Sequence, residues 1–399
     1  MIDRHSNTVI SSIVARAQSK TRCYRPLVRL DGASCANDRM TKVFVSVLID
    51  TCNHERFIEE ALSSVLAQDF PTSEREILVV DDGSTDKTPE ILSKFEPQIR
   101  ILTKSNGGQA SAFNVGIPEC QGEIIAFLDG DDWWVQGKLR RVAELMAGDP
   151  ALGMVGHAII ESFNDASERI ITPDAPRRFR LDSFSSAEFF RRHRCYLGTS
   201  RLTLRSSVAR KILPVPQALI IEADEYLFTL AAALTDSIIL TEPLTHYRIH
   251  GANLFMAPGA FAGGERRKAR AIAALAFELR RALPAAGAPP DAAAAVLELI
   301  NAEAAQLRLQ QDGGMPWITY RAERALYRIQ HQNAPWKSRA FHAFAMISAL
   351  LLPPRWFYTG RRWLGSQSWY KRARRDLLPL PQMTKTNSLP PIRSNHEGK

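Results

Sequence analysis

The sequence contains no apolar run long enough to span a membrane. In its 399 residues, the segment that comes nearest is FHAFAMISALLL at 341–352, which ends at Pro353-Pro354. A membrane-spanning helix needs about 18 or more apolar residues in a row, so this segment is too short. The first 20 residues carry an early acid and no sustained apolar core, which is not the pattern of a signal peptide. We therefore expect a cytoplasmic protein without a membrane span.

Cysteine is scarce, and the motifs of two large classes of nucleotide-binding enzyme are missing. The five cysteines occur singly, without the paired spacing of a zinc site, and their odd number and wide separation disfavour a disulfide framework. The sequence has no GxxxxGK followed by Ser or Thr, and no GxGxxG opens the first predicted helix. These absences count against P-loop ATPases and dinucleotide-dependent enzymes.

Acidic residues are absent from the segment 355–375, which contributes much of the formal net charge of +9. Aromatic and basic residues alternate in the surrounding sequence PPRWFYTGRRWLGSQSWYKRARR, 353–375. This composition is typical of a segment at a membrane interface. A soluble structural helix and an RNA-binding patch are the alternatives, but no nucleic-acid-binding fold accompanies the segment. We expect contact with the inner face of a membrane and no nucleic-acid partner.

Apolar runs and amphipathic stretches alternate between residues 43 and 130. Strands are predicted at 43–49, 76–81, 99–103 and 124–128, and apolar residues between the first two strands recur with helical spacing. This alternation predicts an α/β fold in which a mostly parallel sheet is covered by helices on both faces. After about residue 260 the composition changes to Ala, Arg and Leu, which predicts a helical appendage.

Each of these predicted strands ends in polar residues. Parallel strands bring their carboxyl ends to one edge of a sheet, which is where open α/β sheets place their ligands. Asp129, Asp131 and Asp132 follow the last of the four strands. Such close carboxylates repel each other unless a cation joins them, and oxygen ligands suit Mg²⁺ or Mn²⁺ bridging to a diphosphate. A solvated acidic turn is the alternative interpretation.

Four motifs together carry a resemblance to a known family. They are VSVLIDTCNHERFIEEALSSVLAQ, ILVVDDGSTDKT, NGGQASAFNVGI and GEIIAFLDGDDWW. In order and spacing they resemble the nucleotide-binding half of the family 2 glycosyltransferases, which have the GT-A fold. The match is close over about residues 42–140 and looser over 195–255. The resemblance implies a GT-A domain over 41–260, with a nucleotide-binding half at 41–150 and an acceptor half at 151–260. We expect a poorly ordered extension at 1–40 and a helical, basic region with a disordered tail at 261–399.

The resemblance implies inverting transfer of a sugar from a nucleoside-diphosphate donor, commonly UDP-linked, to an acceptor hydroxyl. The acceptor would be a glycan or a lipid-linked molecule, as in surface polysaccharide or glycolipid assembly. The absence of membrane spans and of a QxxRW-type motif favours addition of one sugar at a time. The roles implied for donor and metal binding fall on seven residues: Thr51, Asn53, Asp81, Asp82 and Asn114 for the nucleotide sugar, Asp129 for ribose and metal, and Asp131 for the metal.

The general base of an inverting transfer is expected near the start of a helix at about 222–234. In the family an Asp at this place is the usual base, which favours Asp224. The family generally has an acid directly before that Asp, whereas Ala223 stands here, so Glu222 and Glu225 remain alternatives. A first turn enriched in acids for the helix dipole is the structural interpretation. In a following YRxH-like segment, His250 is expected to contact the metal or the diphosphate.

Two other functions fit the same fold class. A sugar nucleotidyltransferase would normally have a Gly-rich, basic loop after the first strand, and residues 50–56 contain no Gly. A non-catalytic nucleotide-sugar-binding homologue would be expected to have lost the acidic motif or the base, and both are present in the sequence.

Overall fold

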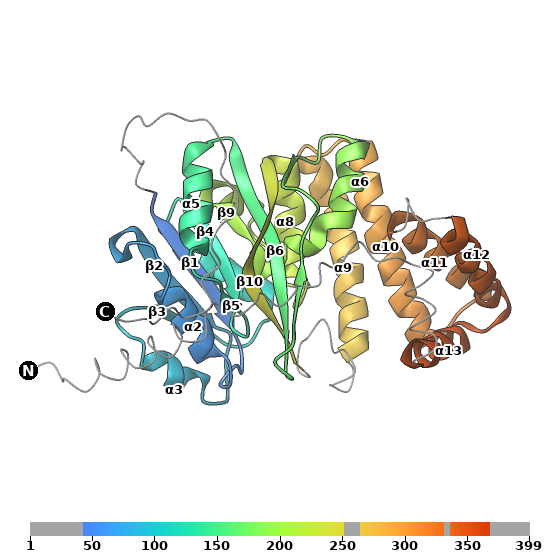
Figure 1. The fold of residues 1–399 in the computed structure, drawn as a ribbon, viewed down its shortest axis with the longest axis horizontal. Coiled ribbons are helices and arrows are strands. Elements are labelled where there is room, and N and C mark those ends of the chain that lie inside the picture. Colours follow the sequence, from blue (N-terminus) through green and yellow to red (C-terminus); the bar gives the residue numbers. More distant parts are fainter. Residues whose placement is uncertain (1–42, 251–263, 331–335, 368–399) are drawn as a thin grey trace, which may run out of the picture. The chain divides into compact units, whose positions relative to one another are not determined.

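The computed structural model describes residues 43–250, 264–330 and 336–367 (Figure 1). The chain divides into two compact units between Arg308 and Leu309. The first unit contains the whole sheet, and the second is helical where the structure describes it. The expectations for residues 1–40 and for the end of the tail concern parts of the chain outside the described residues.

The first four long strands form the predicted parallel sheet. They are β1 (Val45–Thr51), β2 (Arg75–Asp81), β3 (Arg100–Thr103) and β4 (Ile124–Asp129), in the order β3-β2-β1-β4. The register pairs Asp50 with Asp129 and Thr51 with Asp81. Acidic residues from three strands therefore reach the same edge of the sheet, as the sequence predicts.

In the other half of the sheet, the last strand ends at the same edge as the acidic residues. Its strands are β5 (Trp133–Trp134), β6 (Leu152–Phe163), β7 (Glu168–Ile171), β8 (Arg177–Phe179), β9 (Thr203–Arg205) and β10 (Asp236–Ile249). β9 runs antiparallel to β4 and β6, whereas β10 runs parallel to β6 and antiparallel to β5. Because Thr245 and His246 pair with the two tryptophans, the end of β10 lies beside the loop that follows β4.

Helices cover both faces of this sheet, which confirms the predicted α/β layering. The helices of the first unit are α2 (Ile58–Leu66), α3 (Thr88–Ser93), α4 (Gln109–Glu119), α5 (Lys138–Gly148), α6 (Phe184–His193), α7 (Ser206–Ile212), α8 (Ala223–Leu234), α9 (Gly264–Ala285) and most of α10 (Pro290–Asp312). Short 3₁₀ turns are η1 (Thr72–Glu74), η2 (Arg194–Tyr196) and η3 (Thr199–Arg201).

Successive residues of the central strands point into two separate cores. In β4, Ile124 and Leu128 pack with α2 and α5, whereas Ile125 and Phe127 pack with α4 and α8. This alternation follows from the two-residue repeat of a strand. Burial on both faces explains why the strand sequences are continuously apolar.

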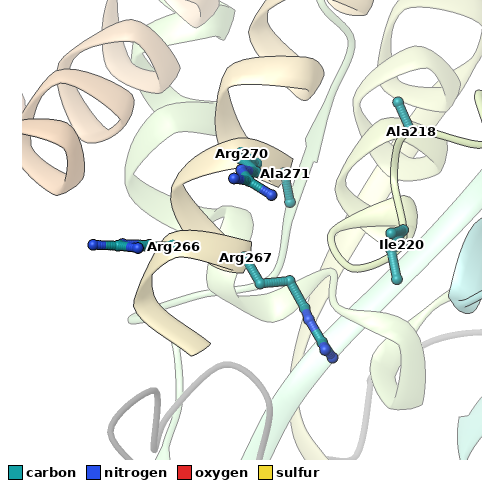
Figure 2. Close-up of a pocket in the computed structure, with 6 residues that line it drawn as sticks. All are labelled: Ala218, Ile220, Arg266, Arg267, Arg270 and Ala271. Atoms are coloured by element: carbon teal, nitrogen blue, oxygen red, sulfur yellow. The ribbon is translucent and has the colours of Figure 1, made fainter. Parts of the chain in front are cut away.

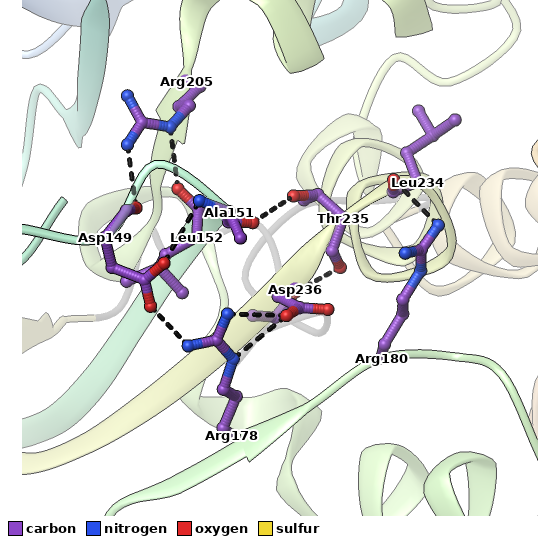
Figure 3. A network of polar contacts seen from close by, with 10 residues as sticks. Asp149, Ala151, Leu152, Arg178, Arg180, Arg205, Leu234, Thr235 and Asp236 are labelled. Atoms are coloured by element: carbon purple, nitrogen blue, oxygen red, sulfur yellow. Dashed lines mark hydrogen bonds and ion pairs between the residues drawn. The ribbon is translucent and has the colours of Figure 1, made fainter.

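A polar network closes the end of the sheet opposite the acidic edge. Arg178 of β8 pairs with both Asp149 and Asp236, and Arg205 of β9 donates from Nε to the backbone oxygen of Leu152 at 2.9 Å (Figure 3). These contacts join the amino ends of β6 and β10. The strands are thereby held in register while their carboxyl ends carry the candidate site.

The second unit contains the end of α10 followed by α11 (Pro316–Gln330), α12 (Trp336–Leu351) and α13 (Pro354–Ser366). Across the described ranges, no helix is both long enough and apolar enough to cross a bilayer. Residues of α9 and α10 such as Leu275 and Val296 share a core with α8. The chain therefore contains the predicted C-terminal helices, and the domain boundary near residue 260 stays a prediction.

Candidate active site

The acidic loop after β4 lies at the centre of the site. Carboxylate oxygens of Asp129, Asp131 and Asp132 all lie within 4.8 Å of one another. Between them, Gly130 donates its N–H to the backbone oxygen of Asp50 at 3.0 Å. A Cβ atom at Gly130 would lie 2.5 Å from the Thr51 hydroxyl oxygen, so a larger residue would push the loop away from β1. The glycine thus allows the acids to approach the end of β1 closely.

Asp50 adds a fourth carboxylate that the sequence analysis did not assign. Its Oδ1 atom is buried and has no hydrogen-bond partner among the described residues. Burial, and then the charges of Asp224, Asp131 and Asp82, raise the pKa of Asp50 to about 8. In the sequence, its position directly after the first predicted strand was the signal that could have identified it.

The electrostatics of the cluster fit a bound divalent cation. Burial and the charges of Asp50 and Asp131 raise the pKa of Asp129 well above its ordinary value. Burial and the charge of Asp131 raise the pKa of Asp132 to about 7, and its Oδ2 atom has no partner in the described chain. The raised pKa values reflect the repulsion between these buried carboxylates, which a bound divalent cation would relieve. Clustered carboxylate oxygens are the ligands that Mg²⁺ or Mn²⁺ prefers.

His250 lies against the acidic loop. Its Nε2 atom is 3.1 Å from Oδ2 of Asp131, and its ring packs at a tilt against Phe57 with 4.6 Å between ring centroids. Burial alone would raise the pKa of Asp131. The hydrogen bond from His250 and the positive charges of His54 and His250 outweigh burial and lower it. Asp131 is therefore the member of the cluster that is most readily ionised.

Arg248 fastens the end of β10 to the same loop. Its backbone N–H donates to Oδ1 of Asp132 at 2.9 Å, and its Nε donates to the backbone oxygen of Asp131 at 2.8 Å. The guanidinium also lies 4.3 Å from the ring centroid of Trp133, which stacks on His246. Arg248 and Trp133 thus support the loop through packing and hydrogen bonds.

Asp81, the last residue of β2, and Asp82, which follows it, have different surroundings. Asp82 accepts hydrogen bonds from Lys104 at 2.5 Å and from the N–H groups of Gly107 at 3.0 Å and Gly108 at 2.7 Å. Asp81 accepts one bond, from the N–H of Ser84 at 3.0 Å, and its Oδ2 atom has no partner in the described chain. Asp82 therefore shapes the loop before α4, while Asp81 keeps an unused acceptor.

Thr51 and Asn53 stabilise the loop after β1. The backbone of Asn53 has a left-handed φ of 57°, and its Oδ1 atom accepts the N–H of Thr85 at 2.8 Å. Thr51 Oγ1 and His54 Nδ1 lie 3.1 Å apart. These contacts hold the loops after β1 and β2 together at the edge of the site.

Asn114 is occupied elsewhere in the fold. Its amide donates to the backbone oxygen of Val215 and accepts the N–H of the same residue, both at 2.7 Å. The contacts fasten α4 to the chain before α8. The structure thus brings Thr51, Asp81 and the acidic loop to one sheet edge, but it commits the Asn114 side chain to packing.

Asp224 lies in the first turn of α8 and is connected to the acidic loop. Its Oδ2 accepts the N–H of Thr199 at 3.1 Å and the Thr199 hydroxyl at 3.2 Å. Gln109 donates from Nε2 to the Thr199 hydroxyl at 3.0 Å and lies 3.5 Å from Oδ1 of Asp129. Its own Oε1 accepts the N–H of Ala223 at 3.1 Å. Gln109 and Thr199, which the sequence analysis did not single out, therefore join the two acidic groups.

The two alternatives for the base lie in a buried ionic cluster. Arg194 pairs with both Glu225 and Glu303. Burial is the main cause that raises the pKa of Glu225 to about 7, although the charge of Arg194 opposes it. Glu222 has a left-handed φ of 68°, and burial, with the charges of Glu225 and Asp224, raises its pKa well above the ordinary value. Glu225 is thus held by Arg194, while Glu222 favours its neutral form.

Comparison with known proteins places this arrangement in a family. The model of glycosyl transferase family 2 matches residues 46–208. An uncharacterized glycosyltransferase of Nostoc sp. (strain PCC 7120) is 34% identical over 232 residues, which are 57% of this chain and 71% of that protein. The chain belongs to glycosyltransferase family 2.

Further similarities are partial. The poly(ribitol-phosphate) β-N-acetylglucosaminyltransferase TarS of Staphylococcus aureus is 39% identical over 92 residues, 22% of this chain and 16% of that protein. The crystal structure of residues 1–349 of TarS with UDP-GlcNAc superimposes with a TM-score of 0.51 and 20% identity, covering 77% of this chain and 87% of that one. The likeness in structure concerns the fold. This family 2 enzyme has the predicted GT-A fold, with helices added at its C-terminal side.

Proposed function

We propose that this glycosyltransferase is metal-dependent and inverting, and that it moves one sugar from a UDP-linked donor to an acceptor hydroxyl. The observation that carries the proposal is the connection from Asp129 through Gln109 and Thr199 to Asp224. It couples a carboxylate cluster suited to a cation with a separate carboxylate suited to a proton. Transfer with inversion places the base that activates the acceptor and the group that stabilises the departing diphosphate on opposite sides of the reacting sugar carbon.

The acidic cluster would hold Mg²⁺ or Mn²⁺ through Asp129 and Asp131, with Asp50 and Asp132 close by. A divalent cation bound there would neutralise the negative charge that develops on the departing diphosphate. The contact between His250 Nε2 and Asp131 Oδ2, at 3.1 Å, orients the Asp131 carboxylate and favours its ionised form. His250 therefore acts as a positioning residue, and it is also a candidate contact of the diphosphate. The donor phosphates are thereby assigned to the carboxyl ends of β1 and β4.

Asp224 is the proposed general base. As the acceptor oxygen bonds to the sugar carbon and the sugar–phosphate bond breaks, the hydroxyl proton passes to Asp224. The two hydrogen bonds from Thr199 orient its carboxylate. Glu222 favours its neutral form and Glu225 is paired with Arg194, so neither is as well prepared to accept a proton.

The nucleoside is assigned to the loops after β1 and β2. Oδ2 of Asp81 is buried and lacks a partner among the described residues, and it can accept the ring N–H of uracil. Thr51 and Asn53 hold the neighbouring loops in place. Asp82 would act indirectly, because its oxygens already hold the loop at Gly107 and Gly108.

We also propose that the second unit contacts an anionic membrane surface on the cytoplasmic side. On α13, Trp356 is 72% exposed and Trp363 is 61% exposed. Because they are seven residues apart, the two tryptophans lie on the same side of the helix. The exposed Arg355 and Arg362 directly precede them in sequence and are likewise seven residues apart. Indole rings beside arginines suit the boundary between lipid head groups and acyl chains. Such contact would suit a lipid-linked acceptor.

The proposed reaction is tested by donor hydrolysis, which needs no knowledge of the acceptor. The purified chain is incubated with UDP-, GDP- and dTDP-sugars in the presence of Mn²⁺, Mg²⁺ or EDTA, and release of the nucleoside diphosphate is measured. Slow UDP release that requires the metal supports the proposal. Release that is equally fast in EDTA would remove the metal from the reaction, and no release from any donor would contradict the donor assignment.

A further inference from the structure

A cavity lies beside the segment that leads into α8. It has a volume of about 350 Å³ and is lined by Ala218, Ile220, Arg266, Arg267, Arg270 and Ala271. Figure 2 shows Ala218 and Ile220 on one wall and the first turns of α9 on the other. Arg267 extends toward the side of Ile220 in this view, and Arg270 lies next to Ala271, whereas Arg266 points the other way.

The arginines of this cavity are not neutralised by acids of the described chain. Arg266, Arg267 and Arg270 are exposed, and no ion pair joins them to another described residue. Lys268, in the same turns of α9, is electrostatically coupled to the buried Glu222 instead. The guanidinium groups are therefore available to bind a negatively charged ligand.

The cavity adjoins the candidate active site through Ile220. The backbone oxygen of Ile220 accepts the N–H of Gln109 at 2.9 Å. A Cβ atom at Gly108 would lie 2.5 Å from the Ile220 side chain, so the loop before α4 packs directly on this wall. Gln109 also bonds Ala223 and approaches Asp129. Ile220 thus lines the cavity and also contacts Gln109, which bonds the residue before the proposed base.

We propose that this cavity binds a phosphate group of the acceptor, so that the enzyme glycosylates a phosphate-bearing acceptor; the assignment of the ligand as acceptor rests on the proposed transfer reaction. A guanidinium group can donate two parallel hydrogen bonds to two oxygens of one phosphate, and its positive charge strengthens the contact. The donor diphosphate is assigned to the acidic cluster. The remaining lining residues are short and aliphatic, and they offer no aromatic ring on which a sugar could stack.

Binding is measured directly, without turnover. Glycerol 1-phosphate is titrated into the full chain saturated with UDP and Mg²⁺, so that the donor site is filled, and its affinity is followed by calorimetry. The double variant R267Q/R270Q is expected to bind at least tenfold more weakly than the unaltered protein. The matched control is R280Q/R281Q, which removes two exposed arginines from the same helix outside the cavity, and its affinity is expected to be unchanged.

Equal affinities for the two double variants, or no saturable binding to the unaltered protein, would overturn the inference. A parallel arm uses vesicles of phosphatidylglycerol to identify the source of the phosphate. If R267Q/R270Q loses vesicle binding and keeps glycerol phosphate binding, the arginines contact lipid head groups and the acceptor assignment is wrong. Donor hydrolysis by the unaltered protein reports separately on the proposed reaction, so that failure of one proposal is distinguishable from failure of the other.

Discussion

Asp224 accepts two hydrogen bonds from one residue, Thr199, through its backbone N–H at 3.1 Å and its hydroxyl at 3.2 Å. Both contacts fix the orientation of the Asp224 carboxylate. The same hydroxyl receives a hydrogen bond from Gln109 at 3.0 Å. The position of Asp224 is therefore linked through Thr199 and Gln109 to the acidic loop after β4.

Asp224→Asn is expected to lower the rate of sugar transfer by a factor of about 10²–10⁴, the usual contribution of general base catalysis. The affinity for UDP with metal should change little, because Asp224 is assigned to the acceptor proton. Glu222→Gln is the matched control, since Glu222 already favours its neutral form. Transfer rates and UDP affinities of both variants provide the measurement. A normal rate in D224N together with a large loss in E222Q would identify Glu222 as the base.

Arg194→Met is expected to destabilise the first unit by about 3–5 kcal/mol, because it leaves the carboxylate of Glu225 buried without its partner. Arg178→Met is the control for loss of an arginine that pairs with two acids. The side chain of Arg178 is almost half exposed, so solvent screens its pairs and the loss should be smaller. Urea unfolding of both variants checks this, and equal losses would contradict the structural role of Arg194.

We expect the first unit to become less stable as the pH is lowered below about 6.5. His157 contributes to this loss of stability. Burial, and then the positive charge of Lys138, lower the pKa of His157 well below its ordinary value in the folded protein. The unfolded chain therefore binds a proton that the folded protein does not, and lowering the pH favours unfolding.

The slope of the unfolding free energy isolates this contribution. Below pH 6.5 the unaltered protein should lose about 1.4 kcal/mol more per pH unit than His157→Leu. The two slopes should coincide above pH 7.5, where the imidazole of His157 is neutral in both the folded and the unfolded state of the unaltered protein. Parallel slopes across the whole pH range would show that His157 takes up a proton in the folded state.

Vesicle flotation tests the proposed membrane contact. The double variant W356S/W363S, and a chain truncated before Pro353, should both bind anionic vesicles more weakly than the full chain. Phe277→Ser is the control, because Phe277 is also an exposed apolar side chain but lies on α9 in the first unit. Unchanged flotation of both the double variant and the truncated chain would show that α13 is not the contact.

The sheet and the acidic edge were predictable because their signals are local. The run from Ile124 to Leu128 is continuously apolar, since both faces of β4 are buried. Parallel strands then bring their carboxyl ends to one edge of the sheet, where the structure pairs Asp129 with Asp50. Such patterns identify the strands, their direction and the edge at which the polar residues gather.

The residues that join the acidic groups could not be recognised in the same way. Gln109 and Thr199 are 90 positions apart, and neither carries a charge that would draw attention to it. Asp81 and Asp82 are adjacent in sequence, and they are distinguished by the bonds that Asp82 receives from Lys104, Gly107 and Gly108. These relationships depend on how the loops pack, which no short-range pattern specifies.

The affinity for UDP with and without Mn²⁺, measured by calorimetry for the unaltered protein and for Asp131→Asn, tests the metal-bound donor most directly. We expect tight binding only when the unaltered protein and Mn²⁺ are both present, with a loss of at least tenfold when either EDTA or the substitution removes the cation. UDP that binds equally well in all these conditions would show that the acidic loop does not hold a cation with the donor diphosphate.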